Sequence, residues 1–318
     1  MELIDIYKAN SDIKNVVRKT GLIKSALSDK CNLFIKPENL QLTGSFKVRG
    51  AYTKVLSLTD EERAKGIIAC SAGNHAQGVA LAAKNMGIKA VVCMPKSAAQ
   101  VKIKSTRDMG AEVVLVEGTY DDAYEKALEL QEEYGYTFVH PFNDEKVIAG
   151  QGTIALEILE ELPETDVIVC AVGGGGLVSG IAYTAKMLKP DIKVYGVQSA
   201  GAPGMYASLA NGYVTKLKKV KTFADGIAVG EVGNITLDYV DKYVDDILTV
   251  SDREILEAIK KLLSKEKLLS EGAGAAPVAA VLNEVVPGLK NESNVVCVVS
   301  GGNIDVDVLS KIVLEGIE

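Results

Sequence analysis

The sequence is poor in the residues that build metal centres and disulfide frameworks. Its 318 residues include only two histidines, His75 and His140, so a histidine-rich metal site is excluded. The cysteines are few, odd in number and scattered, and most of them stand inside apolar runs typical of strands. We therefore expect buried, reduced thiols and a cytoplasmic setting. They are Cys31, Cys70, Cys93, Cys170 and Cys297.

Long hydrophobic runs and an excess of basic charge are also missing. The first ten residues are charged, and the longest apolar run is far shorter than the roughly twenty residues that span a bilayer, so no signal or membrane segment is expected. A formal net charge of -7 argues against nucleic-acid binding. The one dense basic run, residues 216–221, is typical of a solvated loop. With 47% hydrophobic residues the chain can bury a large core and form two lobes.

One lysine stands in an unusual setting, within residues 43–50 (TGSFKVRG). Lys47 directly follows Phe46 in a turn rich in small residues, and Ser45 is expected to cap the helix that comes next. A lysine attacks carbonyls only as the neutral amine, which partial burial and the positive end of a helix both favour. Lys47 is therefore a candidate for covalent attachment of an aldehyde cofactor. The alternative is an ordinary solvated lysine on an amphipathic helix.

A second candidate segment follows a short buried strand predicted at residues 67–70 (IIAC). The polar turn of residues 71–78 (SAGNHAQG) leads from this strand into a helix. The backbone amides of such a turn, with the Ser71 hydroxyl and the Asn74 amide, can hold a substrate carboxylate or a cofactor phenolate. The alternative is a plain helix cap supplied by Ser71 or Asn74.

A third segment places four glycines after the apolar run of residues 167–172 (VIVCAV), which predicts a central parallel strand. A row of glycine amides at a helix N-terminus suits a phosphate dianion. The glycine spacing fits neither a dinucleotide fingerprint nor a Walker loop, so a monophosphate site remains. The alternative is a glycine turn that serves only tight strand-to-helix packing. A last strand, residues 295–299 (VVCVV), ends at Ser300, which can face a heterocyclic nitrogen.

Strand-like and helix-like segments alternate along the chain, including strands predicted at residues 90–94 and 112–116. This pattern predicts an α/β fold with two open, mostly parallel sheets flanked by helices. Ligands of such sheets collect beyond the carboxyl ends of the strands, so the three polar turns predict one shared cleft. We expect a large domain formed by residues 1–43 and 144–318, and a small domain formed by residues 44–143; the family resemblance described next implies that the small domain closes over the substrate.

Four motifs in order, GSFKVRGA, SAGNHAQG, GGGGL and SGGNID, carry a resemblance that covers nearly the whole chain. The sequence resembles the pyridoxal-phosphate enzymes of the tryptophan-synthase-β type (fold type II), and among them the threonine and serine dehydratases, also called threonine ammonia-lyases. This resemblance implies a pyridoxal 5'-phosphate cofactor and the deamination of L-threonine to 2-oxobutanoate and of L-serine to pyruvate. A serine racemase or another lyase of the same fold is the alternative.

The resemblance also implies a role for each motif residue. Lys47 holds the cofactor and moves the substrate proton, Phe46 packs on the cofactor ring, Asn74 bonds the ring hydroxyl and Ser300 faces the pyridine nitrogen. The implied phosphate cup is formed by Gly173, Gly174, Gly175, Gly176 and Leu177. The implied substrate-carboxylate site is formed by Ser71, Gly73, Asn74 and His75.

Some positions depart from the patterns of particular relatives. Relatives that racemise serine carry a second serine where this chain has Ala72, so we expect L-amino acids to be deaminated and not racemised. Metal-dependent relatives carry a glutamate where Gln198 stands, so no divalent-cation site is expected. Residues 270–276 (SEGAGAA) are typical of a helix start capped by Ser270 or Glu271, although relatives place this glutamate near the ring; both interpretations stay open.

The resemblance bears on regulation and assembly as well. Longer dehydratases append an effector-binding domain of the ACT type, and this chain ends soon after its SGGNID motif, so the short form without that domain is expected. Members of the family are homodimers or homotetramers, and some short forms respond to nucleotides. The sequence selects neither an assembly nor a nucleotide effector. His140, next to Pro141, is expected to have a structural role.

Overall fold

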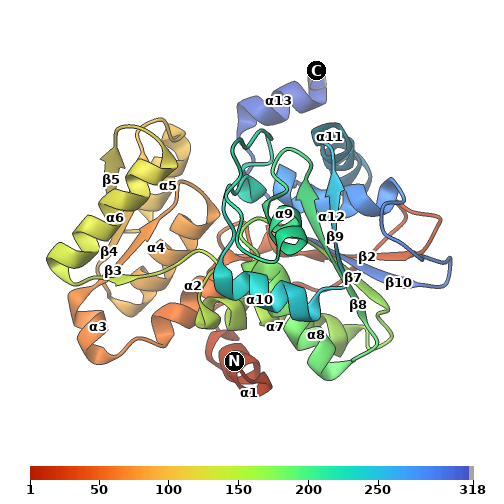
Figure 1. Ribbon diagram of the computed structural model, residues 1–318, viewed down its shortest axis with the longest axis horizontal. Coiled ribbons are helices and arrows are strands. Elements are labelled where there is room, and N and C mark those ends of the chain that lie inside the picture. Colours follow the sequence, from red (N-terminus) through yellow and green to blue (C-terminus); the bar gives the residue numbers. More distant parts are fainter. Residues whose placement is uncertain (315–318) are drawn as a thin grey trace.

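The computed structural model describes residues 1–314 and consists of two β-sheets with helices on both faces of each (Figure 1). The larger sheet has six strands in the order β1-β2-β10-β7-β8-β9. All its neighbouring strands run parallel except β1, which is antiparallel to β2. Its strands are β1 (Ile23–Ser25), β2 (Asn32–Pro37), β7 (Val167–Ala171), β8 (Lys193–Ser199), β9 (Asp246–Val250) and β10 (Asn294–Val299).

The smaller sheet has four parallel strands in the order β5-β4-β3-β6. Strands β3 and β4 lie inside it and are buried along their whole length, which explains their continuous apolar sequences. Its strands are β3 (Ile67–Cys70), β4 (Ala90–Pro95), β5 (Glu112–Val116) and β6 (Thr137–Phe138).

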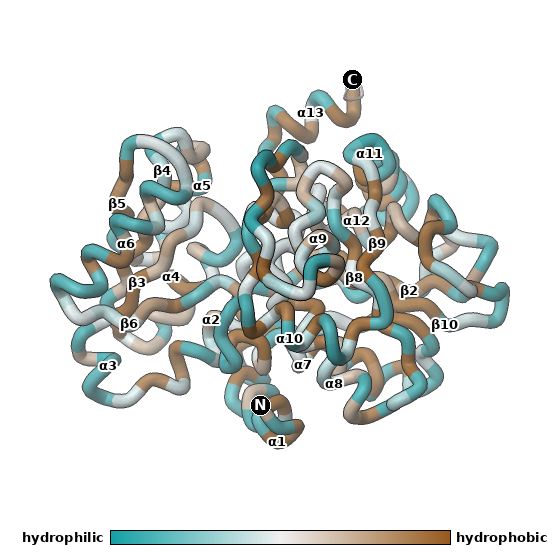
Figure 2. The backbone as a smooth tube through the Cα atoms, viewed as in Figure 1, coloured by the Kyte–Doolittle hydropathy of each residue, from teal (hydrophilic) through white to brown (hydrophobic). Residues whose placement is uncertain are grey.

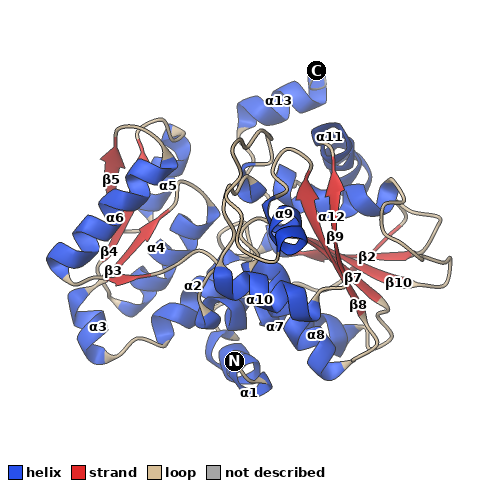
Figure 3. Cartoon of the chain, viewed as in Figure 1, coloured by secondary structure: helices blue, strands red, loops and turns tan. Residues whose placement is uncertain are grey.

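Helices cover both sheets, as Figure 3 shows. Those around the larger sheet are α1 (Leu3–Ile13), α7 (Glu145–Glu161), α8 (Gly176–Leu188), α9 (Gly204–Asn211), α10 (Asn234–Tyr243), α11 (Asp252–Lys261), α12 (Gly272–Leu282) and α13 (Val306–Leu314). Those around the smaller sheet are α2 (Lys47–Leu56), α3 (Asp60–Lys65), α4 (Asn74–Met86), α5 (Gln100–Asp108) and α6 (Tyr120–Tyr134). Short turns of helix are η1 (Glu38–Leu40), η2 (Asp225–Ile227) and η3 (Leu262–Glu266).

Each sheet is sandwiched between two apolar layers. One face of the larger sheet packs against α11 and α12, and the other packs against α7, α8 and α10. The smaller sheet packs against α2 and α4 on one face and against α6 on the other. Figure 2 shows the hydrophobic positions concentrated along the strands and the hydrophilic positions along the outer helices and loops. These layers confirm the α/β fold of two mostly parallel sheets predicted from the alternating pattern.

Helix α7 contacts both α2 and α8 through glycines. A methyl group added at Gly150 of α7 would stand 2.6 Å from the Cα atom of Gly50 on α2. A methyl group added at Gly180 of α8 would stand 2.6 Å from the backbone nitrogen of Gly152 on α7. Both distances are too short for real carbon atoms, so backbone lies directly against backbone along this stack.

The sequence predicted most of these elements, and one expectation about a helix end was wrong. Strands were expected at residues 67–70 and 112–116, where β3 and β5 lie. Ser45 does not cap α2: the N-cap is Phe46, in helical conformation, and the Ser45 hydroxyl is buried without a hydrogen-bond partner among the described residues. Ser45 instead forms an isolated β-bridge with Gly301, which holds its backbone away from the helix. Within residues 1–314 no helix is long and apolar enough to cross a bilayer.

Candidate active site

A cavity of about 840 Å³ lies between the two sheets, at the carboxyl ends of β3, β7 and β10. It brings together segments from the beginning, middle and end of the chain. All the residues selected from the four motifs line it: Phe46, Lys47, Ser71, Gly73, Asn74, His75, Gly173, Gly174, Gly175, Gly176, Leu177 and Ser300. The prediction of one shared cleft is therefore confirmed.

Lys47 is the first residue of α2, and its side chain faces this cavity. Its Nζ atom donates a hydrogen bond to the Pro141 carbonyl at 2.8 Å and lies 5.3 Å from the centre of the Phe46 ring. Burial lowers the pKa of Lys47 to about 8, against a smaller opposing effect of the Glu271 charge. A sizeable fraction of the amine is thus neutral near physiological pH, as nucleophilic attack requires.

The turn that carries Lys47 is fastened to the turn after β10. The Phe46 amide donates to the Ser300 carbonyl at 3.0 Å, and the Gly302 amide donates to the Gly44 carbonyl at 2.9 Å. Gly44 has a φ of 69°, in the left-handed region that favours glycine. Lys47 and Ser300 are therefore held at one end of the cavity by backbone bonds between segments more than 250 residues apart.

The asparagine loop enters α4 without a side-chain cap. The N-cap residue is Gly73, whose amide donates to the Ser71 hydroxyl at 3.2 Å, and Asn74 begins the helix. The alternative interpretation, a plain cap supplied by Ser71 or Asn74, is thus wrong, and the first residues of this helix line the cavity. His75 Nε2 lies 2.7 Å from the Val139 carbonyl, and burial, with the nearby Lys47 charge, lowers the pKa of His75 to about 3. His75 is consequently neutral at physiological pH.

The tetraglycine loop joins β7 to α8 at the other end of the cavity. Gly175, the N-cap of α8, has a φ of 100°, and no side chain caps this helix, so its first amides remain available to a ligand. Two polar side chains donate hydrogen bonds to carbonyls in the loop and just before it. The Thr236 hydroxyl donates to the Gly174 carbonyl at 2.6 Å, and Gln198 Nε2 donates to the Val172 carbonyl at 3.3 Å.

Several charged or polar residues that line the cavity were not selected as site residues from the sequence, among them Lys102, Asp225, Glu271 and Asn303. Glu271 is the N-cap residue of α12, as one of the two interpretations had it, but its side chain makes no cap bond and instead accepts from Asn74 Nδ2 at 2.7 Å. Burial and the Asp225 charge raise the pKa of Glu271 to about 7. Lys102 of α5 bonds Asp225 at 2.8 Å. These contacts join distant segments, so the local sequence pattern gives no signal for them. For Glu271 the signal was the resemblance, because relatives place this glutamate near the ring, and Glu271 does line the cavity.

Other sequence expectations concern residues that were not selected from the four motifs. His140 Nδ1 accepts from the Asn143 amide at 2.8 Å, a structural bond, as expected. The five cysteines are free and buried, as expected. Gln198 is fully buried, and besides Val172 it bonds the Ala202 carbonyl at 3.3 Å and accepts from the Tyr206 amide.

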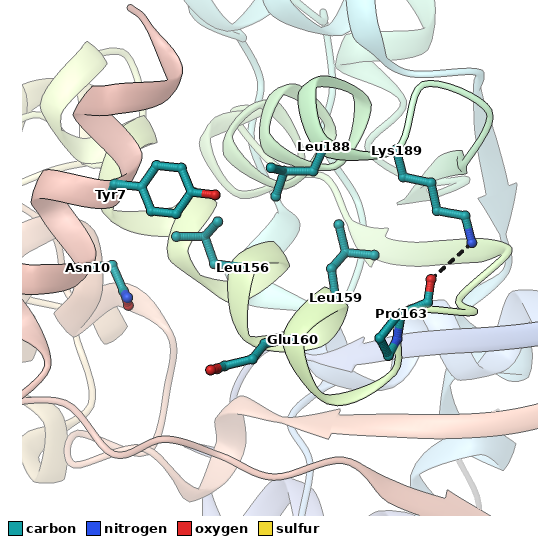
Figure 4. Close-up of a pocket in the computed structure, with 8 residues that line it drawn as sticks. All are labelled: Tyr7, Asn10, Leu156, Leu159, Glu160, Pro163, Leu188 and Lys189. Carbon is teal, nitrogen blue, oxygen red and sulfur yellow. Dashed lines mark hydrogen bonds between the residues drawn. The ribbon is translucent and has the colours of Figure 1, made fainter.

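A second, more open hollow of about 500 Å³ lies between α1, α7 and α8 (Figure 4). None of the motif residues lines it. Its two charged side chains already have partners: Lys189 Nζ donates to the Pro163 carbonyl at 3.1 Å, and Glu160 pairs with Lys19 at 2.6 Å. This hollow therefore lacks the reactive and anion-binding groups that the cavity between the sheets contains.

Comparison with known proteins assigns the family. The model of the family described as "pyridoxal-phosphate dependent enzyme" matches residues 13–301. The chain belongs to this family. A relative in Thermotoga maritima, named L-threonine ammonia-lyase, is 50% identical over 319 residues, covering 99% of this chain and 79% of the relative.

Solved structures of other pyridoxal-phosphate enzymes have the same fold. The processed form of threonine deaminase isoform 2 from Solanum lycopersicum is 38% identical with a TM-score of 0.91, over 98% of this chain and 88% of that one. Maize serine racemase is 35% identical with a TM-score of 0.93, over 98% of this chain and 96% of that one. The predicted family and fold are thereby confirmed.

The residues present fit pyridoxal phosphate. An amine with a lowered pKa stands at one end of the cavity, and at the other end glycines pack so closely that added side chains would collide with Phe142, Met205 or Thr236. Amides at an uncapped helix start provide donors for a phosphate dianion. An aldehyde-reactive group and a phosphate site facing one cavity are what this cofactor needs.

Proposed function

We propose that this protein is a pyridoxal-phosphate-dependent ammonia-lyase that converts L-threonine into 2-oxobutanoate and ammonia, and L-serine into pyruvate and ammonia. The observation that carries the proposal is the 50% identity, across 99% of the chain, with a protein named L-threonine ammonia-lyase. The cavity supports it, because an amine of lowered pKa lies beside groups that can bind a carboxylate.

The cofactor would be held by residues from three segments of the chain. Lys47 would bind the aldehyde, Phe46 would pack on the ring, Asn74 would donate to the ring hydroxyl and Ser300 would face the pyridine nitrogen. The phosphate would rest on the amides of Gly173, Gly174, Gly175, Gly176 and Leu177. When bound, pyridoxal phosphate supplies an electron sink that stabilises negative charge on the substrate α-carbon.

The substrate would be oriented by the asparagine loop, while Lys47 moves the proton. The carboxylate would accept hydrogen bonds from Ser71, Gly73, Asn74 and His75, among which His75 is held neutral by burial. The Lys47 amine would remove the α-proton of the substrate as a neutral base. Its pKa of about 8 suits this step, because the amine is neither fully protonated nor a poor acceptor at physiological pH.

Ser300 favours elimination over other outcomes. Ser300 would offer the pyridine nitrogen a neutral hydroxyl, whereas a carboxylate at this place would keep that nitrogen protonated. Elimination would remove the α-proton and the β-hydroxyl of the substrate, and water would hydrolyse the released imine to the 2-oxo acid and ammonia. Ser300 is 3% exposed, so water does not take its place as a hydrogen-bond partner of the ring.

An assay of 2-oxobutanoate formation from L-threonine tests the proposal. The purified protein should form the product only with pyridoxal phosphate bound, and Lys47→Ala should abolish both product formation and covalent retention of the cofactor after borohydride reduction. Lys54→Arg is the matched control, because Lys54 lies on the same helix and pairs with Asp144 at 2.7 Å, a bond that arginine can keep. Unimpaired deamination by the Lys47→Ala variant would refute the proposal.

Serine racemisation is the second candidate, favoured by the 35% identity and the TM-score of 0.93 with maize serine racemase. Ala72 lies in the cavity wall and offers no group that could return a proton to the opposite face of the α-carbon. We therefore expect chiral analysis of reactions with L-serine to show pyruvate and little D-serine. Ala72→Ser should increase D-serine formation. Appreciable D-serine from the unmodified protein would favour the racemase.

We also propose a division into a large domain, residues 1–43 and 144–318, and a small domain, residues 44–143, that closes over the substrate. Support comes from the separate sheets and from ion pairs between them: Lys102 bonds Asp225 at 2.8 Å, and Lys216 bonds Asp121 at 3.2 Å. Closure would exclude water and complete the carboxylate site. Small-angle scattering with and without a substrate analogue should show a decrease in the radius of gyration.

The remaining proposals concern assembly, regulation and location. We propose a homodimer or homotetramer, which light scattering can distinguish, and a nucleotide effector, which kinetics with and without added nucleotides can detect. The buried reduced thiols support a cytoplasmic location.

A further inference from the structure

The side chain of Asn74 is held on both sides by residues from distant segments of the chain. Its Nδ2 atom donates to Glu271 Oε1 at 2.7 Å, and its Oδ1 atom accepts from Asn303 Nδ2, also at 2.7 Å. Asn303 Nδ2 donates in addition to the Thr43 carbonyl at 2.8 Å. Four residues from four separate segments thus form one chain of hydrogen bonds along the cavity wall.

The direction of this chain follows from its two ends. The Thr43 carbonyl can only accept, so the amide nitrogen of Asn303 must face it, and the same nitrogen then donates to the oxygen of Asn74. The nitrogen of Asn74 consequently lies on the opposite side, where one of its two N–H groups donates a hydrogen bond to the Glu271 carboxylate. The oxygen and nitrogen of an Asn amide cannot be told apart by shape alone. A network with acceptors at both ends allows only one assignment of the two atoms.

The surroundings preserve this arrangement. Glu271 is 4% exposed and Asn303 is half-buried, so water competes little for the bonds. A methyl group added at Gly301 would stand 2.5 Å from Glu271 Oε1, and one added at Gly44 would stand 2.5 Å from Asn303 Oδ1. The two glycines therefore leave the space that Glu271 and Asn303 occupy.

We infer that Glu271 and Asn303 are positioning residues for the cofactor: together they fix the Asn74 amide so that its second N–H points at the ring oxygen of pyridoxal phosphate. The inference rests on the proposed role of Asn74. When Glu271 is ionised, its charge beside one N–H of the Asn74 amide also polarises the group and strengthens the bond that the other N–H donates. Because Asn74 begins α4 beside the smaller sheet while Glu271 begins α12 beside the larger one, the same bonds tie the asparagine loop across the cavity.

A double-mutant cycle on cofactor affinity tests this inference. The dissociation constant of pyridoxal phosphate and the wavelength of its visible absorption band are measured for the wild type, Glu271→Leu, Asn74→Ala and the double variant. If Glu271 acts through Asn74, Glu271→Leu should weaken binding about tenfold in the wild-type background and less than about twofold once Asn74 is alanine. The band should shift in Glu271→Leu, because a hydrogen bond to the ring oxygen changes. Glu271→Gln, which keeps an acceptor oxygen, should retain most of the affinity.

Two further variants keep the test informative. If Glu271→Leu does not fold, Asn303→Ala enters the same cycle with Asn74→Ala, because it removes the donor on the other side of the amide. Glu266→Gln is the matched control: its carboxylate also accepts one hydrogen bond, from Ser25 at 2.7 Å, and it does not line the cavity, so its cofactor affinity should equal that of the wild type.

The outcomes separate this inference from the proposed function. If Glu271→Leu weakened cofactor binding equally with and without the Asn74 side chain, or did not weaken it at all, the inference would be overturned. The proposed deamination of threonine would be unaffected by that result. Coupled losses in a protein that forms no 2-oxobutanoate would support the inference and refute the proposed reaction. A protein that binds no pyridoxal phosphate would overturn both.

Discussion

The guanidinium of Arg49 bonds the carboxylate of Glu157 in two places, with Nη1 2.7 Å from Oε1 and Nη2 2.9 Å from Oε2. The same guanidinium bonds both carboxylate oxygens of Glu38 at 2.8 Å, and Lys36 bonds Glu157 at 2.5 Å. All four side chains are buried. The network joins β2, η1 and α7 to α2, two residues after Lys47, so it anchors the helix that presents the reactive amine.

Replacement of Arg49 by methionine should destabilise the protein strongly. Two buried carboxylates would then share one remaining cation, and an uncompensated buried charge costs about 3 to 5 kcal/mol in the free energy of unfolding. Urea unfolding followed by circular dichroism measures this loss. Lys65→Met is the control, because Lys65 and Glu61 form a surface pair at 3.1 Å that contributes little. Equal stability of the two variants would show that the network is not needed for folding.

The stability of the protein should depend on the ionisation of Glu271. Burial and Asp225 raise the pKa of this carboxyl from 4.5 to about 7, against the smaller opposing effects of Asn74, Lys102 and Asn303. A raised pKa contributes stability below the unfolded value, and that stability is lost as the pH rises through the folded value. Relative to Glu271→Gln, the wild type should lose up to about 3 kcal/mol between pH 4.5 and pH 7.

Urea midpoints of the wild type and Glu271→Gln at several pH values check this prediction. The difference between the two proteins isolates Glu271, because every other titrating group is shared. A constant difference across the range would show that Glu271 ionises as an ordinary surface carboxyl does.

The rate of cofactor attachment to Lys47 should follow the neutral fraction of its amine. Since its pKa is lowered to about 8, the rate should rise about tenfold per pH unit below pH 8 and level off above it. Stopped-flow absorbance after mixing pyridoxal phosphate with cofactor-free protein measures the rate, and Lys47→Arg supplies the blank. A rate that keeps rising to pH 10 would indicate an ordinary solvent-exposed lysine.

Gly175→Ala should weaken cofactor binding, whereas Gly212→Ala should not. Both glycines have positive φ, 100° and 74°, so both variants carry a similar backbone strain of about 1 to 2 kcal/mol. Only at Gly175 would the new methyl group collide, 2.6 Å from Met205 Cε and 2.8 Å from Thr236 Cβ; at Gly212 nothing lies within 4 Å. Absorbance titrations with pyridoxal phosphate measure the difference. Equal affinities would show that the tetraglycine loop tolerates displacement.

The parts of the fold with strong local patterns were predictable from the sequence. Buried parallel strands such as β3 and β7 have continuous apolar sequences. The polar turns after β7 and β10 meet because these two strands are parallel neighbours in the larger sheet. The turn after β3 belongs to the smaller sheet, and its place beside the other two depends on how the two sheets pack. Strand β2 was not predicted, since it contains a lysine, Lys36, whose burial depends on partners elsewhere in the chain.

Contacts between distant segments were not predictable in this way. Ser45 is of a residue type that commonly caps helices. It pairs instead with Gly301, far along the chain, and the helix starts at Lys47. Glu271 was also expected to cap a helix, but its side chain bonds Asn74, which is 197 residues away in the sequence. In both cases tertiary contacts override the local preference of a residue, and a single sequence carries no record of them.

The glycine contacts among α2, α7 and α8 fix the spacing of these helices. One outer helix starts at the reactive lysine and the other at the tetraglycine bend, and each rests on α7 through main-chain atoms. Main-chain atoms lie against main-chain atoms at these contacts, so peptide geometry helps to set the span between the amine and the tetraglycine loop. The separation of aldehyde and phosphate in a bound molecule would have to match that span.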